Sequence, residues 1–207
     1  MALLSGAGVM LNIARRTVRH RQTLLARSAG FTLPEMLITI AIICTVSAMS
    51  IAVMPSFFTN SRADSSVTAA LQQIRLARDR AIAERRNIEM NFVSPNKIQL
   101  VREEIPAPVT TTLSTTYLEN DQQFLQFPGI PDTPDAFGNS GPIAFGGSPK
   151  IIFTSEGTLV DSVGDVLNGT VFLGNTGAKT SARAVTIFGP TALLRVWKWD
   201  GTKWTEG

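Results

Sequence analysis

Few side chains in this sequence could carry enzymatic chemistry. The chain of 207 residues has one histidine, His20, and one cysteine, Cys44. A single cysteine excludes an intrachain disulfide and a zinc site of the CxxC kind. His20 lies in an arginine-rich N-terminal segment. If that segment is removed, no imidazole remains for Ser-His-Asp or Cys-His catalysis or for metal binding. We therefore predict that the protein is not an enzyme and that it uses no cofactor and no metal.

Two loops contain residue types that sometimes bind ligands. Residues 136–148 are rich in glycine, but no strand-then-helix pattern surrounds them, so we expect a loop rather than a phosphate cradle. Asp161, Asp165 and Asn168 could line a calcium-binding loop, although their spacing differs from that of an EF-hand. Neither loop identifies a site by its sequence alone.

The positive charge of the chain is concentrated at its N-terminus. Of the 19 Lys and Arg residues, five arginines lie in residues 1–30, where there is no Asp or Glu. The remaining 14 are outnumbered by the 16 acidic residues. The net charge of +3 therefore comes from the N-terminal segment and does not indicate a nucleic-acid-binding domain.

One carboxylate has an unusual position. Glu35 stands directly before an apolar run, residues 36–54, which contains no charged side chain. As a helix this run would be about 28 Å long, close to the ~30 Å hydrocarbon core of a bilayer. An unpaired charge inside a bilayer costs on the order of 3 kcal/mol, so an acid here needs a partner or access to the interface.

Three interpretations of the apolar run are open. It could be a retained single-pass anchor, with its arginine-rich side in the cytoplasm. It could be the core of a secretory signal peptide that is cleaved after Ala48. It could also be a buried core helix, although its length and its one-sided basic flank argue against this. The chain beyond Met54 favours the anchor, because the helical pattern does not stop there.

Helical periodicity resumes in residues 64–87, beyond Pro55, which should kink the helix. Asp64 is a plausible N-cap for this second half, and Arg80 with Glu84 forms an i,i+4 pair. The apolar residues recur at spacings of three and four on one face: Val67, Ala70, Leu71, Ile74, Ala77, Ala81 and Ile82. We expect a long helix that leaves the membrane and presents this stripe to a folded domain.

At this point the sequence resembles a known family. GFTLPEML (30–37) and the apolar run after it resemble the class III signal of type IV pilins and pseudopilins. VMPSFF (53–58) and ALQQIRLARDRAIAERRNIEMNF (70–92) resemble the GspH/FimT group of minor pseudopilins and minor pilins. IIFTSEGTLV (151–160) and ARAVTIFGP (182–190) resemble later blocks of that group more loosely.

The resemblance implies how the N-terminus is processed. In that family a membrane prepilin peptidase cuts after the glycine, here Gly30, and methylates the new amino terminus, here Phe31. The glutamate five residues into the mature chain, here Glu35, is thought to neutralise the amino terminus of a neighbouring subunit during filament growth. The alternative is that Glu35 only marks the end of the membrane segment.

After residue 87 the pattern changes to that of short strands. Residues 88–93 and 97–102 predict a hairpin. Residues 104–150 contain many prolines and predict long loops around a short strand at 124–127. Further strands are expected at 150–154, 170–174, 183–189 and 192–199. We predict a pilin-like α+β fold, in which a long N-terminal helix packs on one or two antiparallel sheets.

The sequence ends in a tryptophan-rich segment, WKWDGTKW (197–204). Asp200-Gly201 favours a two-residue turn that places Trp197 opposite Trp204, with Trp199 on the same face. This aromatic face could pack on the domain. It could instead contact a neighbouring subunit or, less well for a net acidic chain, nucleic acid. The residues of that surface would be Arg195, Trp197, Lys198, Trp199 and Trp204.

The chain is expected to have four parts. They are a basic prepilin leader (1–30), a transmembrane half of the helix (31–58), an amphipathic half (59–87) and a β-rich globular domain (88–207). The expected function is that of a minor pseudopilin or minor pilin in a type II secretion pseudopilus or a type IV pilus-like filament. Two alternatives are a DNA-binding minor pilin for natural transformation and a secreted β-domain released by signal peptidase.

The expected location is the inner membrane, with the leader in the cytoplasm and the C-terminal domain in the periplasm before filament assembly. The partners that the resemblance implies are other pilin or pseudopilin subunits, prepilin peptidase, the inner-membrane assembly platform and membrane lipid. Nucleic acid is a further partner only under the DNA-binding alternative.

Overall fold

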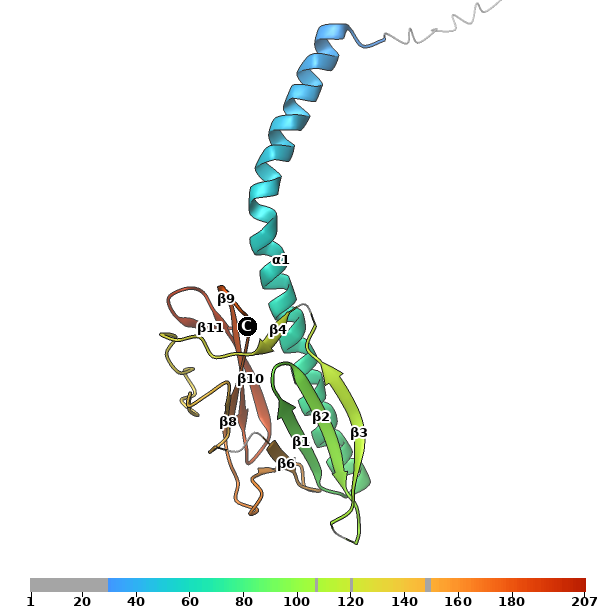
Figure 1. The fold of residues 1–207 in the computed structure, drawn as a ribbon, viewed down its shortest axis with the longest axis vertical. Coiled ribbons are helices and arrows are strands. Elements are labelled where there is room, and N and C mark those ends of the chain that lie inside the picture. The colour runs from blue at the N-terminus through green and yellow to red at the C-terminus, as the bar shows by residue number, and fades with distance from the viewer. Residues whose placement is uncertain (1–29, 107, 120, 148–149) are drawn as a thin grey trace, which may run out of the picture. The chain divides into compact units, whose positions relative to one another are not determined.

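The computed structural model describes residues 30–106, 108–119, 121–147 and 150–207 (Figure 1). The predicted leader lies outside these residues except for Gly30, so nothing is described of its arginines or of His20. The chain divides into two compact units between residues 45 and 46. The first described unit is the short segment from Gly30 to Thr45, and the second contains residues 46–207.

One helix, α1 (Leu33–Glu84), is the only helix within the described parts of the chain. It continues through Pro55, because proline removes a backbone hydrogen bond without having to end a helix. Asp64 therefore lies inside α1, and the prediction that it caps a second helical segment is wrong. Its carboxylate forms a tertiary ion pair instead, described below.

Short strands follow the helix and form two antiparallel sheets. Sheet A has the order β3-β2-β1-β6-β7, and sheet B has the order β11-β10-β9-β8-β4 with β5 also paired to β8. Sheet A consists of β1 (Ile88–Val93), β2 (Lys97–Glu103), β3 (Thr110–Tyr117), β6 (Lys150–Phe153) and β7 (Leu159–Val160). Sheet B consists of β4 (Gln122–Phe124), β5 (Ile143–Ala144), β8 (Gly169–Asn175), β9 (Ala178–Phe188), β10 (Leu193–Trp199) and β11 (Trp204–Glu206). The α+β prediction and the predicted β1–β2 hairpin are confirmed.

Strand β3 lies where the sequence predicted only loops. Its sequence, TTTLSTTY, has little apolar alternation because β3 is an edge strand of sheet A and most of its side chains are exposed. The signal that could have identified it is the run of β-branched threonines, which favour an extended backbone. The prolines at 106 and 108 precede the strand and do not interrupt it.

The end of α1 is fixed by a backbone cap and by charges. Arg85 has a φ of 50°, and the N–H of Arg86 donates to the carbonyl of Ala81 at 3.2 Å, as in a Schellman motif. Glu84 pairs with Arg102 of β2 at 2.8 Å, not with Arg80 as the sequence predicted. These contacts tie the end of the helix to sheet A.

Arg102 also pairs with Glu104 at 2.6 Å, so its guanidinium lies between two carboxylates. The hydrogen bond from Arg102 is the main reason why the pKa of Glu104 lies below its ordinary value. The hydrogen bond from Arg102 to Glu84 is, in turn, the main reason why the pKa of Arg102 is raised.

The main core lies between the C-terminal part of α1 and both sheets (Figure 1). Val67, Ala70, Ile74, Ala77 and Ala81 are buried, as the stripe predicted, whereas Ile82 is exposed. Sheet A contributes the apolar side chains Ile88, Met90, Phe92, Ile98, Leu100, Ile151 and Phe153, and sheet B contributes Phe124, Val171, Leu173, Val185 and Ile187. The ring of Phe92 meets that of Phe124 edge-on at 5.5 Å, which joins the two sheets.

A second apolar cluster covers the opposite, outer face of sheet B. It contains all three tryptophans, which are buried against Phe172 and against the segment 125–130. The predicted hairpin register is wrong, because Trp199 rather than Trp197 lies opposite Trp204. The carboxylate of Asp200 accepts the N–H groups of Thr202 and Lys203, which makes a four-residue loop instead of a two-residue turn.

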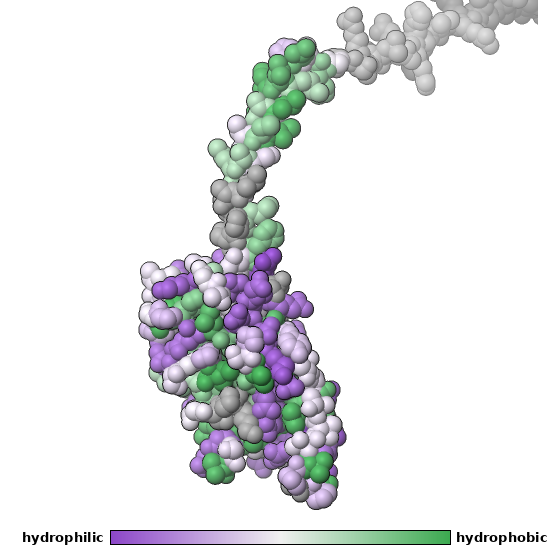
Figure 2. All heavy atoms as spheres, in the orientation of Figure 1, coloured by the Kyte–Doolittle hydropathy of each residue, from purple (hydrophilic) through white to green (hydrophobic). Residues whose placement is uncertain are grey.

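The surfaces of the described residues differ along the sequence. Figure 2 shows hydrophobic side chains gathered along the N-terminal half of α1, whereas polar and apolar side chains are mixed over the β-rich part. A mixed surface is typical of a domain in water, and an exposed continuous apolar surface is typical of a segment in contact with lipid or protein.

Gly189, which follows β9, allows a test of this packing. A Cβ at this position would lie 2.1 Å from the carbonyl oxygen of Leu167. Because this neighbour is backbone, it cannot move aside as the tip of a side chain could. We expect Gly189→Ala to lower the free energy of unfolding by about 1–3 kcal/mol in denaturant titrations of the detergent-solubilised chain. Gly141→Ala is the matched control, because a Cβ there meets nothing within 4 Å. Equal effects of the two substitutions would contradict the packing.

Candidate functional site

The first candidate site is the start of α1, where the predicted processing and assembly residues lie. Gly30 and Phe31 precede the helix and are exposed. The backbone N–H of Thr32 donates to the Glu35 carboxylate at 3.4 Å, and the Thr32 hydroxyl donates to the same oxygen at 3.4 Å. Thr32 and Glu35 thus match the Thr-x-x-Glu pattern of a capping box. This local role of Glu35 was not predicted, although the spacing of Thr32 and Glu35 indicates it.

The helix beyond Glu35 has the length and composition of a membrane span. Residues 33–50 have a mean hydropathy of 1.8, and none of this window is buried within the protein. Pro34 lies in the first turn, where a missing N–H leaves no hydrogen bond unmade. Three hydroxyls of the span, those of Thr39, Thr45 and Ser50, donate to carbonyls three or four residues earlier. These hydrogen bonds satisfy polar groups that lipid could not.

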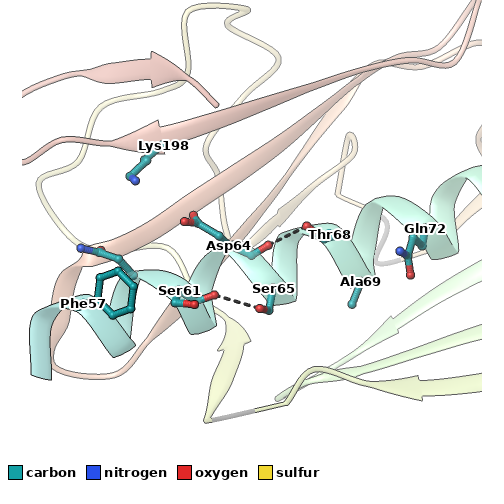
Figure 3. A pocket seen from close by; sticks show the side chains of 9 residues that line it. Phe57, Ser61, Asp64, Ser65, Thr68, Ala69, Gln72 and Lys198 are labelled. Carbon is teal, nitrogen blue, oxygen red and sulfur yellow. Dashed lines mark hydrogen bonds between the residues drawn. The ribbon is translucent and has the colours of Figure 1, made fainter. Parts of the chain in front are cut away.

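The second candidate site is a polar groove between α1 and sheet B (Figure 3). The groove has a volume of about 740 Å³, and small polar side chains of the helix form one wall. The hydroxyls of Ser65 and Thr68 donate to the carbonyls of Ser61 and Asp64, at 3.0 and 2.9 Å. Their hydrogen bonds therefore stay within the helix. Lys198 of β10 lies across the groove from Asp64 (Figure 3).

Asp64 connects the helix to a buried cation. Its carboxylate accepts a hydrogen bond from Arg183 at 2.7 Å, and the Arg183 side chain is only 1% exposed. Arg183 lies directly opposite Lys198 in the β9–β10 ladder. Like charges opposite each other in a sheet repel, so an acid on the facing helix relieves this repulsion. No local pattern predicts this pair, because its members are 119 residues apart.

The third candidate site is a hydrogen-bonded hub on the outer face of sheet B. Asp135 accepts hydrogen bonds from the Thr186 hydroxyl at 2.5 Å, from Trp197 Nε1 at 3.1 Å and from Arg195 at 2.6 Å. Burial alone would raise the pKa of Asp135. The three donors more than offset this effect, so the pKa lies below its ordinary value.

The structure divides the predicted partner surface between two faces of sheet B. Trp197, Trp199 and Trp204 are buried on the outer face, which favours the alternative that they pack on the domain. Arg195 points to the same outer face as Trp197, because residues two apart share a face, whereas Lys198 points to the inner face. Arg195 and Lys198 therefore do not form one basic strip.

Two side-chain oxygens of the conceivable calcium loop accept backbone hydrogen bonds. Asp161 Oδ1 accepts the N–H groups of Val163 and Asp165, and Asn168 Oδ1 accepts the N–H of Gly189. In the described part of the chain, no group of three or more His, Cys, Asp or Glu side chains could hold a metal ion. The loop is accounted for as a turn that fastens to the end of β9.

Comparison with known proteins identifies the N-terminal segment. The family model of the prokaryotic N-terminal methylation motif matches residues 25–51. This match includes Gly30, Phe31, Glu35 and most of the apolar run. No curated protein matches the chain.

Two solved structures are similar to the chain at low sequence identity. One is the minor pseudopilin EpsH from the Type 2 Secretion System of Vibrio cholerae, at 14% identity and a TM-score of 0.45, covering 66% of this chain and 97% of that chain. The other is the type IV minor pilin FimU of Pseudomonas aeruginosa, at 13% identity and a TM-score of 0.44, covering 73% of this chain and 95% of that chain. Because both scores are below 0.5, no function is inferred from either.

The ion pair between Asp64 and Arg183 can be tested by neutral substitution. Asp64→Asn should lower the free energy of unfolding by about 2–3 kcal/mol, because it leaves the buried guanidinium without its carboxylate. Because the side chain of Asp64 is half exposed, the expected decrease in the free energy of unfolding lies at the lower end of the range for breaking a buried ion pair. The measurement is denaturant unfolding of the detergent-solubilised chain. Asp79→Asn, an exposed acid on the same helix, should change stability by less than about 0.5 kcal/mol. A loss no larger than that of the control would refute a stabilising role for the pair.

The hub at Asp135 should make stability depend on pH. Because its folded-state pKa is lowered, its contribution is fully present above the unfolded value of about 4 and is lost as pH falls below it. At pH 7, Asp135→Asn should be less stable than the parent chain by about 1–3 kcal/mol. This difference should shrink as pH falls from about 5 to 3, because protonation then removes the same charge from the parent.

Tryptophan fluorescence can report this unfolding, since Trp197 donates to Asp135. The exposed carboxylate of Asp121 supplies the control, and Asp121→Asn should show no comparable difference at pH 7. A stability difference for Asp135→Asn that stayed constant down to pH 3 would contradict the role of its charge.

Proposed function

We infer that this chain, a type IV pilin-like protein, is a minor pseudopilin or minor pilin of a type II secretion pseudopilus or a type IV pilus-like filament. The observation that carries this proposal is the methylation motif at residues 25–51, which coincides with the apolar start of α1. The pilin-like α+β fold behind that helix supports it. Proteins of this kind are structural subunits and not enzymes.

Prepilin peptidase would cut between Gly30 and Phe31 and methylate the amine of Phe31. The exposure of both residues, and their place before the first helical turn, support this proposal. Peptidases need an extended, accessible backbone, and helical backbone is a poor substrate. A Cβ at Gly30 would meet nothing within 4 Å, so the space around this backbone is open.

Glu35 would pair with the positively charged amine of a neighbouring subunit as the filament grows. The position of the carboxylate supports this role, since it is exposed at the edge of an apolar span. A charge at this edge is costly unless it has a partner or reaches the interface. The hydrogen bonds to Thr32 offer a competing local role, which is to cap the helix.

The proposed location follows from the span and the charge of the leader. One apolar helix suffices for a single pass through the inner membrane, with the arginine-rich leader on the cytoplasmic side. The β-rich part would then be periplasmic until the subunit enters a filament. Its partners would be other pilin or pseudopilin subunits, prepilin peptidase, the assembly platform and membrane lipid.

The decisive experiment combines N-terminal analysis with two substitutions of Glu35. Mass spectrometry of the protein from its host membrane should find a mature chain that begins with N-methylated Phe31. Glu35→Ala and Glu35→Gln should both lower the amount of subunit in sheared filaments by about tenfold or more, which corresponds to about 1.4 kcal/mol. Glutamine preserves the capping hydrogen bond and removes only the charge, so this variant separates the two roles.

Thr39→Val is the matched control, because it changes a polar side chain of the same span and should enter filaments normally. Normal incorporation of Glu35→Gln would show that Glu35 acts as a helix cap and not as a charge. A mature chain that begins at Met49 would show cleavage by signal peptidase and would rule out the proposed function.

A further inference from the structure

The outer face of sheet B is covered over only part of its area. The segment 125–130 packs on the tryptophans, and Trp204 Nε1 donates to the carbonyl of Pro131 at 2.8 Å. Beyond this cover, at the other end of β9 and β10, Phe188 is 40% exposed and Leu193 is 52% exposed. Large apolar side chains on a sheet face are normally buried, so the described residues leave this end of the face only partly covered.

These exposed side chains belong to one apolar patch around a shallow pocket. The pocket has a volume of about 220 Å³, and its apolar walls are Phe137, Phe188 and Leu193. The rings of Phe137 and Phe188 stack at 6.4 Å. We call Phe137, Phe188 and Leu193 the open patch.

Arg195 holds a fixed cation at the edge of the open patch. One of its guanidinium nitrogens donates to Asp135, while half of the side chain remains exposed. Asp135 is itself held by Thr186 and Trp197, so the guanidinium is oriented before any partner arrives. A guanidinium has five N–H donors in a planar fork that matches a carboxylate, and the bond to Asp135 uses only one nitrogen.

We propose that the open patch and Arg195 form a docking surface for a segment of another protein subunit that presents a carboxylate beside an apolar side chain. The proposal deepens the proposed function, on which it rests for the class of partner. The positive charge of Arg195 favours a carboxylate on the partner, and the apolar walls of the open patch favour an apolar side chain next to that carboxylate. Nucleic acid fits this surface less well, because its binding requires a broad, positively charged groove. Here the carboxylate of Asp135 lies beside Arg195, and Lys198 points to the opposite face of the sheet.

The docking surface can be tested in cells that assemble the filament. A photoreactive benzoylphenylalanine replaces Phe188 in the full-length chain, and the cross-linked partner and its contact residue are mapped by mass spectrometry. We expect a protein adduct at a segment with an acidic residue next to an apolar one. Leu193→Glu should lower the adduct yield about tenfold, because it places a second carboxylate against the first. Lysine in place of the partner's acidic residue should then restore the yield.

Leu193→Glu is preferred because Leu193 lies outside the hydrogen bonds of Asp135, so the domain should still fold. Arg195→Gln is the second variant and should also lower the yield, with tryptophan fluorescence as the check that the hub is intact. The matched control places the same photoreactive residue at Tyr117, which is exposed on β3 of sheet A, where Leu193→Glu should change nothing.

Several results would overturn the docking surface. They are the lack of a protein adduct at position 188, an adduct that Leu193→Glu leaves unchanged, an adduct at a basic segment, and an adduct removed by nuclease. N-terminal analysis of the same cells separates the two proposals. A methylated Phe31 terminus with no adduct removes only the docking surface. A chain that begins at Met49 but forms the charge-dependent adduct removes only the filament function.

Discussion

The small side chains along one stripe of α1 determine how closely the helix approaches both sheets. Ala63, Ala70, Ala77 and Ala81 are fully buried, and Ile74 fills the space between them. Because alanine adds little bulk, β-strands on two sides can pack against the same helix and share one core. Residues 33–50 of the same helix differ, since they are long and apolar enough to cross a membrane and none of them is buried against the rest of the described chain. One helix thus has two kinds of surface, a stripe that packs in a protein core and a stretch with the composition of a membrane span.

Arginine ion pairs in the β-rich part join elements that the apolar core also brings together. Arg183 ties sheet B to the middle of α1, Arg102 ties sheet A to the end of α1, and Arg195 ties β10 to Asp135, in the loop that follows the segment 125–130. Each guanidinium is held by at least one carboxylate. Of these three arginines, only Arg195 belongs to the partner surface that the sequence predicted. Arg195 differs from the other two because half of it remains exposed beside an apolar patch.

The periodicity of apolar residues predicted the elements that bury one face and expose the other. It did not predict features that depend on side-chain hydrogen bonds or on contacts between residues far apart in the sequence. The stripe of α1 and the hairpin of β1 and β2 were predicted because their apolar periods match helix and strand geometry. The register of the tryptophan hairpin was not predicted, since the Asp200 side chain accepts two backbone N–H groups and lengthens the loop. The partner of Asp64 could not be found by pattern either. The local sequence around Asp64 is typical of a helix N-cap, and only the folded chain brings the buried Arg183 next to its carboxylate.

The capping role of Glu35 and its proposed role in assembly are physically compatible. In the isolated subunit the carboxylate has two long hydrogen bonds, both 3.4 Å, and the positive end of the helix dipole beside it. At the edge of a membrane these interactions would make the charge of Glu35 less costly before a neighbouring subunit is present. Long hydrogen bonds are weak, so little is lost when the carboxylate turns toward a cationic amine. In a medium of low dielectric constant the attraction between the two charges is far stronger than in water. The Glu35 carboxylate would thus have hydrogen-bond partners in the monomer and a stronger, ionic partner in the filament. Such a residue would favour filament assembly without destabilising the monomer in the membrane.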